Sequence, residues 1–143
     1  MDRQVVEEKL ESLRRCVRRV AEKCPPDVET LKRDLDLQDI LTLNLSRAVQ
    51  MCVDIGAHLV AGLEVPPPDS MGQTFDILVQ SGVIPAELGR SLKKAVGFRN
   101  VAVHNYDEIN WAIVHAIALS HLGDFSEFAR VIGLALDRNS PTP

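Results

Sequence analysis

The sequence predicts an all-α fold, an up-and-down bundle of four or five main helices plus one short helix. Three observations lead to this class. Apolar residues recur at helical spacing along most of the 143 residues, and aromatic residues make up only 4% of them. No stretch of useful length alternates apolar and polar residues as a half-buried strand does. A chain of this length suits one domain, which we expect at residues 1–136, followed by a flexible tail at 137–143.

A first helix is expected over residues 2–23, because its apolar residues repeat at steps of four and three. They form one stripe: Val6, Leu10, Leu13, Val17 and Val20. Four arginines lie off this stripe, at positions 14, 15, 18 and 19. The ordinary interpretation is a solvated charged face, and the sharper alternative is a patch that contacts phosphates. Pro25 and Pro26 end the helix.

A second, long helix is expected to begin at Val28 or at Asp36 and to reach Leu59. Helically spaced apolar residues define it: Leu41, Leu45, Ala48, Cys52, Ile55 and Leu59. A helix of about thirty residues is long for a globular domain, so a bend or break is expected near residues 34–36. Gly62 then permits the helix to end, and the proline-rich segment EVPPPDS forms a stiff loop.

The short helix follows this loop, and its two ends carry residues typical of helix ends. Ser70 and Gln73 have the form of a capping box, and Gly82 suits a left-handed turn at the other end. Pro85 is expected in the first turn of the next helix, which continues into the segment at 97–108.

Two more helices complete the expected bundle. Residues 105–108 have the N-x-x-E form of a second capping box, so a helix is expected to start there. Gly123 and Asp124 are expected to break it, and the segment FSEFARVIGLAL forms the last helix.

Bulk properties exclude several classes of protein. The formal net charge of −4 gives no overall basic field of the kind that binds nucleic acid, so any such contact has to be local. Three cysteines without a C-x-x-C spacing argue against a disulfide scaffold or zinc site and for a reducing compartment. No signal-peptide core or membrane-spanning run is present, so we expect a cytoplasmic protein without membrane contact.

The segment GFRNVAVHNYDE, at 97–108, concentrates groups that bind phosphate or move a proton. Histidine takes and gives a proton near neutral pH, and arginine binds phosphate through a planar fork. Arg99 and His104 together suit cleavage of an RNA phosphodiester by the RNA's own 2′-hydroxyl, with His as the base and Arg stabilising the transition state. The sequence has no acidic cluster suited to a two-metal nuclease, so we expect no metal and no cofactor.

The spacing within this segment raises a geometric difficulty. Asn100 and His104 are four apart and share one helix face, whereas Arg99 and His104 are five apart and point about 140° away from each other. Either the helix ends near His104, or a second copy of the chain supplies the missing partner across a two-fold axis. The apolar residues at 101–103 are expected to form the packed side of the same helix.

A purely structural interpretation of these residues also stands. His104 could cap a helix end, and Tyr106 could be a core aromatic residue with its hydroxyl at the surface. The remaining histidines, at positions 58, 115 and 121, are expected in packing or surface roles. Trp111 is expected in the core or an interface rather than as a platform for a base.

The stretch FRNVAVHNY resembles the R-x4-H-x-Y signature of HepT, the toxin subunit of HEPN–MNT toxin–antitoxin pairs. Arg99, His104 and Tyr106 fit the pattern without a gap, and Asn100 matches the polar residue that HEPN ribonucleases usually carry there. The segments LSRAVQMCVDIGAHL and FDILVQSGVIP are similar to HepT-like segments in order and spacing, and the likeness covers roughly residues 30–135. One departure is Asn105, where many relatives have Glu.

The resemblance implies an HEPN-like bundle and a metal-independent endoribonuclease toxin that cuts a tRNA or an mRNA. Arg99 and His104 would be the catalytic pair in a cleft at a homodimer interface, and Asn100 would orient them. Tyr106 would accept AMP units from a nucleotidyltransferase antitoxin of the MntA type, which would block the cleft. Arg47 and Asp54 are candidate cleft-lining residues. No metal is implied.

Two functions of other classes stay open from the residues alone. The chain could be a non-catalytic helical subunit that binds substrates and presents them to a partner nucleotidyltransferase, which would suit its negative charge. It could also be a structural bundle, in which case substitutions in the segment at 97–108 would be tolerated.

Overall fold

The computed structural model describes residues 2–138, and this part of the chain folds into helices without a strand. Seven α-helices and one 3-10 helix follow one another in it. They are α1 (Arg3–Lys23), α2 (Val28–Arg33), α3 (Leu35–Ala61), α4 (Met71–Gln80), α5 (Ala86–His104), η1 (Tyr106–Glu108), α6 (Trp111–Ser120) and α7 (Leu122–Arg138). The predicted all-α bundle is confirmed.

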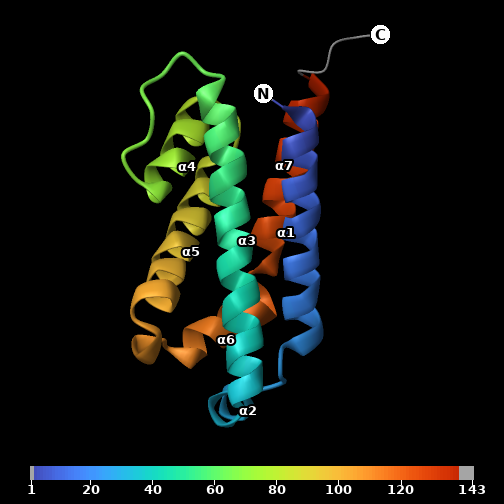
Figure 1. The fold of residues 1–143 in the computed structure, drawn as a ribbon, viewed down its shortest axis with the longest axis vertical. Helices are drawn as coiled ribbons and strands as arrows, with labels where there is room; N and C mark the ends of the chain where they lie inside the picture. The colour runs from blue at the N-terminus through green and yellow to red at the C-terminus, as the bar shows by residue number, and fades with distance from the viewer. Residues whose placement is uncertain (1, 139–143) are drawn as a thin grey trace.

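The long helices α1, α3, α5 and α7 run along the length of the molecule (Figure 1). Helix α3 is central and packs against α1, α4 and α5, while α7 packs behind α1. Helices α2 and α6 contact each other at the lower end of the view in Figure 1. The beginning of α1 and the end of α7 meet at the opposite end, where Arg3 donates a 2.7 Å hydrogen bond to Asp137.

The core lies between these four helices and consists almost entirely of aliphatic side chains. Three aromatic rings join it: Phe75 from α4, and Phe125 and Phe128 from α7. Phe75 and Phe128 meet edge to face with centroids 6.2 Å apart. The stripe expected on the first helix is buried except for Val17, which is half-buried. Burial of this stripe against α3 accounts for the long contact between the two helices.

Most of the expected helix ends are confirmed. The long second helix is interrupted at Asp34, whose side chain caps α3 by accepting a 3.1 Å hydrogen bond from the Leu37 amide. Ser70 caps α4 by accepting a hydrogen bond from the Gln73 amide. The Gln73 side chain in turn accepts from the amide of Asp69, one residue before the N-cap, so the reciprocal bond of the capping box is shifted by one residue. Gly82 has φ of 75°, as the left-handed turn requires.

Two expected helix starts are wrong. Pro85 is the N-cap of α5 and not part of its first turn. Asn105 makes no side-chain cap, and the helix expected there begins at Trp111, where the Asn110 side chain accepts from the Ala112 amide at 3.0 Å. An N-x-x-E pattern alone does not make a cap, because the asparagine must also take the backbone conformation of an N-cap.

The last break also differs from the expectation. Gly123 and Asp124 lie inside α7, and the interruption falls at His121, the C-cap of α6. Glycine in the first turn of a helix costs little, so it does not end the helix. Helix α7 continues to Arg138, which takes in the first two residues of the expected tail, and positions 139–143 lie outside the described residues.

None of the helices in the described range is both long enough and apolar enough to cross a membrane. Cys16, Cys24 and Cys52 are all free thiols. Burial raises the pKa of the Cys52 thiol far above its usual range, so this side chain behaves as a small apolar residue.

Candidate functional site

The predicted catalytic residues lie on the last turns of α5, which remains a regular α-helix up to His104. The chain then leaves the helix at Asn105, with φ of −140° and ψ of 57°. Of the three apolar residues at 101–103, only Ala102 is buried, and Val103 is 53% exposed. The expectation that all three pack inward is wrong, because consecutive residues on a helix point about 100° apart.

His104 is exposed at the end of α5 and makes no hydrogen bond or ion pair with any described residue. Its imidazole is therefore accessible to a ligand from solvent. Arg99 is half-buried, and its Nη1 donates a 3.3 Å hydrogen bond to Oδ1 of the neighbouring Asn100. Because α5 is regular, the angle of about 140° between Arg99 and His104 remains, and one chain does not aim both at one point.

Tyr106 lies in the 3-10 turn and contacts two other elements. Its hydroxyl donates a 2.6 Å hydrogen bond to Oδ1 of Asp39 on α3. Its ring meets Trp111 edge to face, with centroids 6.0 Å apart. Partial burial, and then the hydrogen bond to the Asp39 carboxylate, raises the pKa of Tyr106 to about 12. The phenol is thus held protonated, although 39% of the residue is exposed.

Asp39 was missed by sequence reasoning. It is one of several acidic residues on an exposed helix face, and its partner is 67 positions away. No local pattern marks a contact of this kind, so only the fold identifies it.

The remaining histidines take the packing and surface roles expected of them. His115 is buried, and its Nε2 lies 2.8 Å from the Pro25 carbonyl oxygen in the loop between α1 and α2. His121 is exposed, with Nδ1 4.0 Å from an Asp124 carboxylate oxygen. Trp111 is half-buried beside Tyr106.

Arg47 and Asp54 lie on α3 at a distance from the end of α5. Arg47 faces α1 and lines a groove between the two helices. Asp54 accepts a 2.8 Å hydrogen bond from Gln50 and forms a 3.6 Å ion pair with Lys9 of α1. Within the described residues neither side chain forms a hydrogen bond or an ion pair with Arg99, Asn100 or His104, so their place in a cleft stays a prediction.

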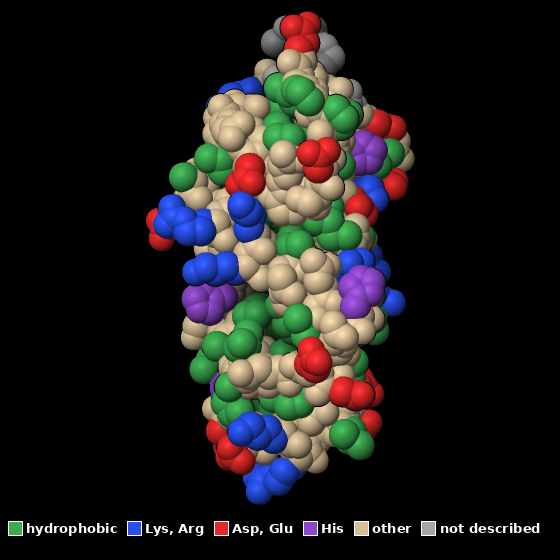
Figure 2. Space-filling model, turned by 90° about the vertical axis from the view of Figure 1, so that its left-hand side faces the viewer, with side chains coloured by type: hydrophobic (Ala, Val, Ile, Leu, Met, Phe, Trp, Pro, Cys, Tyr) green, Lys and Arg blue, Asp and Glu red, His purple; other side chains and the backbone are tan. Residues whose placement is uncertain are grey.

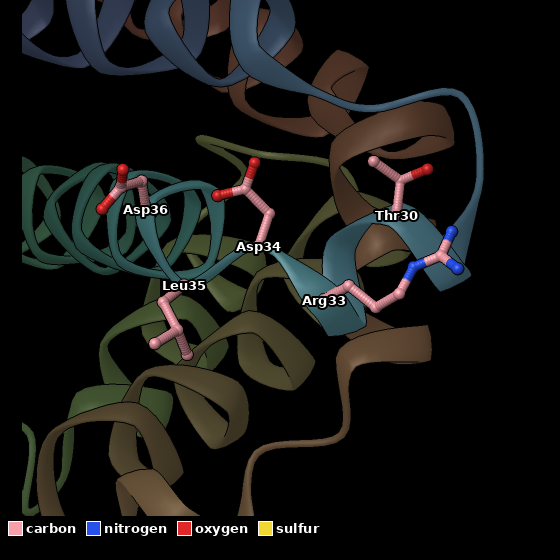
Figure 3. Close-up of a pocket in the computed structure, with 5 residues that line it drawn as sticks. All are labelled: Thr30, Arg33, Asp34, Leu35 and Asp36. Carbon is pink, nitrogen blue, oxygen red and sulfur yellow. The ribbon is translucent and has the colours of Figure 1, made fainter.

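Three of the hollows on the described part of the surface are considered as candidate sites. One lies where α2 meets α3, and Figure 3 shows its lining residues. There the Asp34 and Asp36 carboxylates point to one side and Leu35 to the opposite side, so these groups do not converge on one point. Asp34 is already engaged as the cap of α3.

A second hollow, of about 600 Å³, lies between α5, α6 and α7 and has mainly apolar walls, to which Phe98, Ile113 and Ile117 contribute. The face formed by α4 and α5 shows hydrophobic side chains gathered below its middle and Lys and Arg side chains above them (Figure 2).

The third hollow is the groove between α1 and α3, of about 640 Å³. Over residues 2–138, no three His, Cys, Asp or Glu side chains come together as metal ligands would.

The chain is similar to known proteins both at the level of a family and at the level of single relatives. The family described as Ribonuclease HepT-like matches residues 6–132. The mRNA nuclease HepT of Shewanella oneidensis is 37% identical over 128 residues, which cover 90% of this chain and 96% of that relative.

Two solved structures are similar along almost their whole length. One is a tri-AMPylated Shewanella oneidensis HEPN toxin in complex with an MNT antitoxin, with a TM-score of 0.85 and 36% identity over 94% of this chain and 99% of that chain. The other is a toxin–antitoxin structure with AMP-PNP, with a TM-score of 0.86 and 35% identity over 92% of this chain and 98% of that chain.

Proposed function

Because the chain belongs to the HepT-like ribonuclease family, we propose that it is an endoribonuclease and the toxin of a toxin–antitoxin pair. The single observation that carries the catalytic part is the end of α5. There an exposed His104, whose side chain has no partner among the described residues, follows Arg99 with four residues between them, as in the R-x4-H motif. The chain is also 37% identical to an mRNA nuclease. We place its action in the cytoplasm, an inference supported by the three free cysteines.

The reaction is an attack by the RNA on itself. His104 takes the proton of a 2′-hydroxyl, and that oxygen forms a bond to the adjacent phosphorus. The bond from phosphorus to the 5′-oxygen breaks, and this oxygen takes a proton from an acid, which leaves a 2′,3′-cyclic phosphate and a 5′-hydroxyl. Arg99 stabilises the negative charge on the phosphoryl oxygens in the transition state, and Asn100 orients the Arg99 guanidinium through their hydrogen bond. A tRNA or an mRNA supplies the phosphodiester.

The site needs two copies of the chain. A regular α5 directs Arg99 and His104 about 140° apart, so a symmetric homodimer would bring one chain's Arg and the other chain's His to the same phosphate. One His104 would then be the base and the other the acid.

Tyr106 is the proposed point of control. A nucleotidyltransferase antitoxin would join its hydroxyl oxygen to the α-phosphorus of ATP, with release of pyrophosphate and of the phenol proton. The relative that is tri-AMPylated in complex with an MNT antitoxin supports this step. So does the position of Tyr106, two residues beyond His104 at the exposed 3-10 turn. The added phosphates would cover the cleft and repel RNA.

The test is cleavage of RNA by the purified chain in the presence and absence of EDTA. We expect cleavage in both conditions, and its loss in Arg99→Ala and in His104→Ala with an unchanged circular dichroism spectrum. His121→Ala is the matched control, since this histidine is exposed and distant in sequence from the motif. Cleavage that survives both motif substitutions rules the proposal out.

A second candidate is the non-catalytic subunit that presents substrates to a nucleotidyltransferase, favoured by the formal net charge of −4. In that case RNA stays intact with the wild-type chain, with or without EDTA. The same assay therefore separates the two functions.

A further inference from the structure

The groove between α1 and α3 is basic in a chain whose formal net charge is −4. Its volume is about 640 Å³. Both helices contribute its lining, which contains no acidic residue: Ser12, Arg15, Cys16, Arg19, Ile40, Leu43, Asn44, Arg47 and Met51. We call this hollow the arginine groove, after Arg15, Arg19 and Arg47.

None of the three arginines is neutralised by the described part of the chain. Elsewhere arginines pair with carboxylates, as Arg3 does with Glu7 and Arg130 with Glu127. Arg15, Arg19 and Arg47 have no such pair within residues 2–138. Three uncompensated guanidinium groups in one hollow repel each other, so this arrangement favours an anionic ligand.

The arginines face the groove from opposite walls. Arg15 and Arg19 are one turn apart on α1, a rise of about 6 Å, and Arg47 extends from α3. The pKa of the Cys16 thiol, which lies between the two helices, is influenced by arginines on both walls of the groove. Burial raises its pKa, while the charges of Arg47 and Arg15 each act to lower it. The charges therefore act on the same small volume.

One exposed face of α3 leads from Asp39, at the candidate site, to this groove. Asp39, which holds the Tyr106 hydroxyl, is followed at helical spacing by Leu43 and then by Arg47. Leu43 is 50% exposed and lines the groove. Asp39 and Arg47 are eight residues apart, a rise of about 12 Å along α3. A strand bound near Tyr106 can thus reach the arginines within a few nucleotides.

We propose that the arginine groove binds the phosphodiester backbone of the RNA substrate, outside the bond that is cut. This inference rests on the proposed ribonuclease function and adds a second place at which the same strand is held. Guanidinium groups bind phosphate oxygens without reading bases, so the groove positions the strand and does not select its sequence. The apolar lining, from Ile40, Leu43 and Met51, offers a surface for sugar and base faces.

The test uses a fluorescent RNA that carries 2′-O-methyl groups throughout, which the proposed chemistry cannot cut. Its dissociation constant is measured by anisotropy at several salt concentrations for the wild type and for Arg15→Gln, Arg19→Gln, Arg47→Gln and the triple variant. Each single change should weaken binding and reduce the slope of log K against log salt by about 0.7, and the triple change by about 2.

Arg18→Gln is the matched control. Arg18 is on the same helix and exposed, has no ion pair among the described residues, and does not line the groove. It should leave the affinity and the slope nearly unchanged. Thermal unfolding of each variant confirms that the fold is intact, and the three single variants give the answer if the triple variant unfolds.

Cleavage of ordinary RNA by the wild type separates this inference from the proposed function. If the wild type cuts and binds RNA but the triple variant binds with the same constant and slope, the groove inference is wrong and the ribonuclease stands. If binding depends on the groove but the wild type does not cut, the groove stands and the catalytic proposal falls. If the variants no longer bind the partner nucleotidyltransferase but bind RNA as the wild type does, the groove is a protein-docking surface and the inference is overturned.

Discussion

The Tyr106 hydroxyl and the Asp39 carboxylate are joined by a 2.6 Å hydrogen bond between residues 67 positions apart. This bond attaches the turn that follows the proposed catalytic segment to the central helix α3. It also makes the pKa of the Tyr106 hydroxyl, the proposed AMP acceptor, depend on Asp39, a residue that does not react itself. Asp39 is in this sense a positioning residue.

Asp39→Asn should lower the pKa of Tyr106 from about 12 toward the ordinary value of about 10. The substitution removes the negative charge that favours the protonated phenol and leaves only a weaker, neutral amide acceptor, while burial remains. Tyr106 is the one tyrosine of the chain, so absorbance at alkaline pH follows this residue alone. An unchanged titration would show that Asp39 does not influence the phenol.

The same shift gives a pH dependence of stability. Because the pKa is raised on folding, the contribution of Tyr106 is full below the unfolded pKa of about 10 and is lost as the pH rises toward about 12. Tyr106→Phe removes this dependence. Urea unfolding of both proteins at pH 8 and above measures it, and parallel curves for the two would contradict the prediction.

A mixed dimer with His104→Ala in one protomer should cleave RNA far below half of the wild-type rate. If one histidine is the base and the other the acid, each cut site loses a proton transfer worth about 10²-fold or more. Differently tagged protomers allow the mixed species to be isolated. A mixed dimer with His121→Ala is the control, and full activity of the His104 mixture would sink the two-histidine mechanism.

Expression together with a nucleotidyltransferase antitoxin of the MntA type should raise the intact mass of the chain in steps of one AMP residue. The added mass should map to the peptide that contains Tyr106 and should be absent from Tyr106→Phe. A neutralised complex in which this tyrosine carries nothing would instead favour simple occlusion of the site.

His115→Ala should destabilise the fold by about 1–3 kcal/mol, because the buried Pro25 carbonyl loses its partner and a cavity remains. Urea unfolding gives the free energy. His121→Ala, at an exposed histidine, should change it by less than about 0.5 kcal/mol. Equal effects of the two would show that the His115 bond is not important.

Two glycine substitutions should act in opposite directions. A Cβ at Gly89 on α5 would lie 2.5 Å from Val79 Cγ2 on α4, so Gly89→Ala should destabilise by about 1–3 kcal/mol. A Cβ at Gly133 on α7 would meet nothing within 4 Å. Gly133→Ala should therefore stabilise by about 0.5–1 kcal/mol, since alanine favours the helix. Stabilisation by both would mean that α4 and α5 can separate at no cost.

Local patterns were sufficient to predict much of the fold. Apolar spacing identified the stripes of α1 and α3. The hydroxyl of Ser70 and the backbone freedom of Gly82 identified the ends of α4. The same kind of pattern failed at Asn105, because Asn110 satisfies the cap instead and the intervening turn is held by a distant contact of Tyr106. The residues next to Tyr106 in the sequence give no indication of such a contact.

The candidate site shows the same division. The spacing of Arg99, His104 and Tyr106 is visible in the sequence, and so is the row of arginines on the first helix. The sequence left open which of those arginines contact phosphate. Their convergence with Arg47 depends on how α1 packs against α3, and that packing selects Arg15 and Arg19 over Arg18.

The segment from Tyr106 to His115 is a short tether with a separate attachment at each end. Tyr106 is held by α3, and His115 is held by the loop before α2. A group added to the Tyr106 oxygen removes the proton of the first attachment but leaves the second intact. The proposed modification would therefore alter the turn at the surface without breaking the bond that holds α6 to the loop before α2.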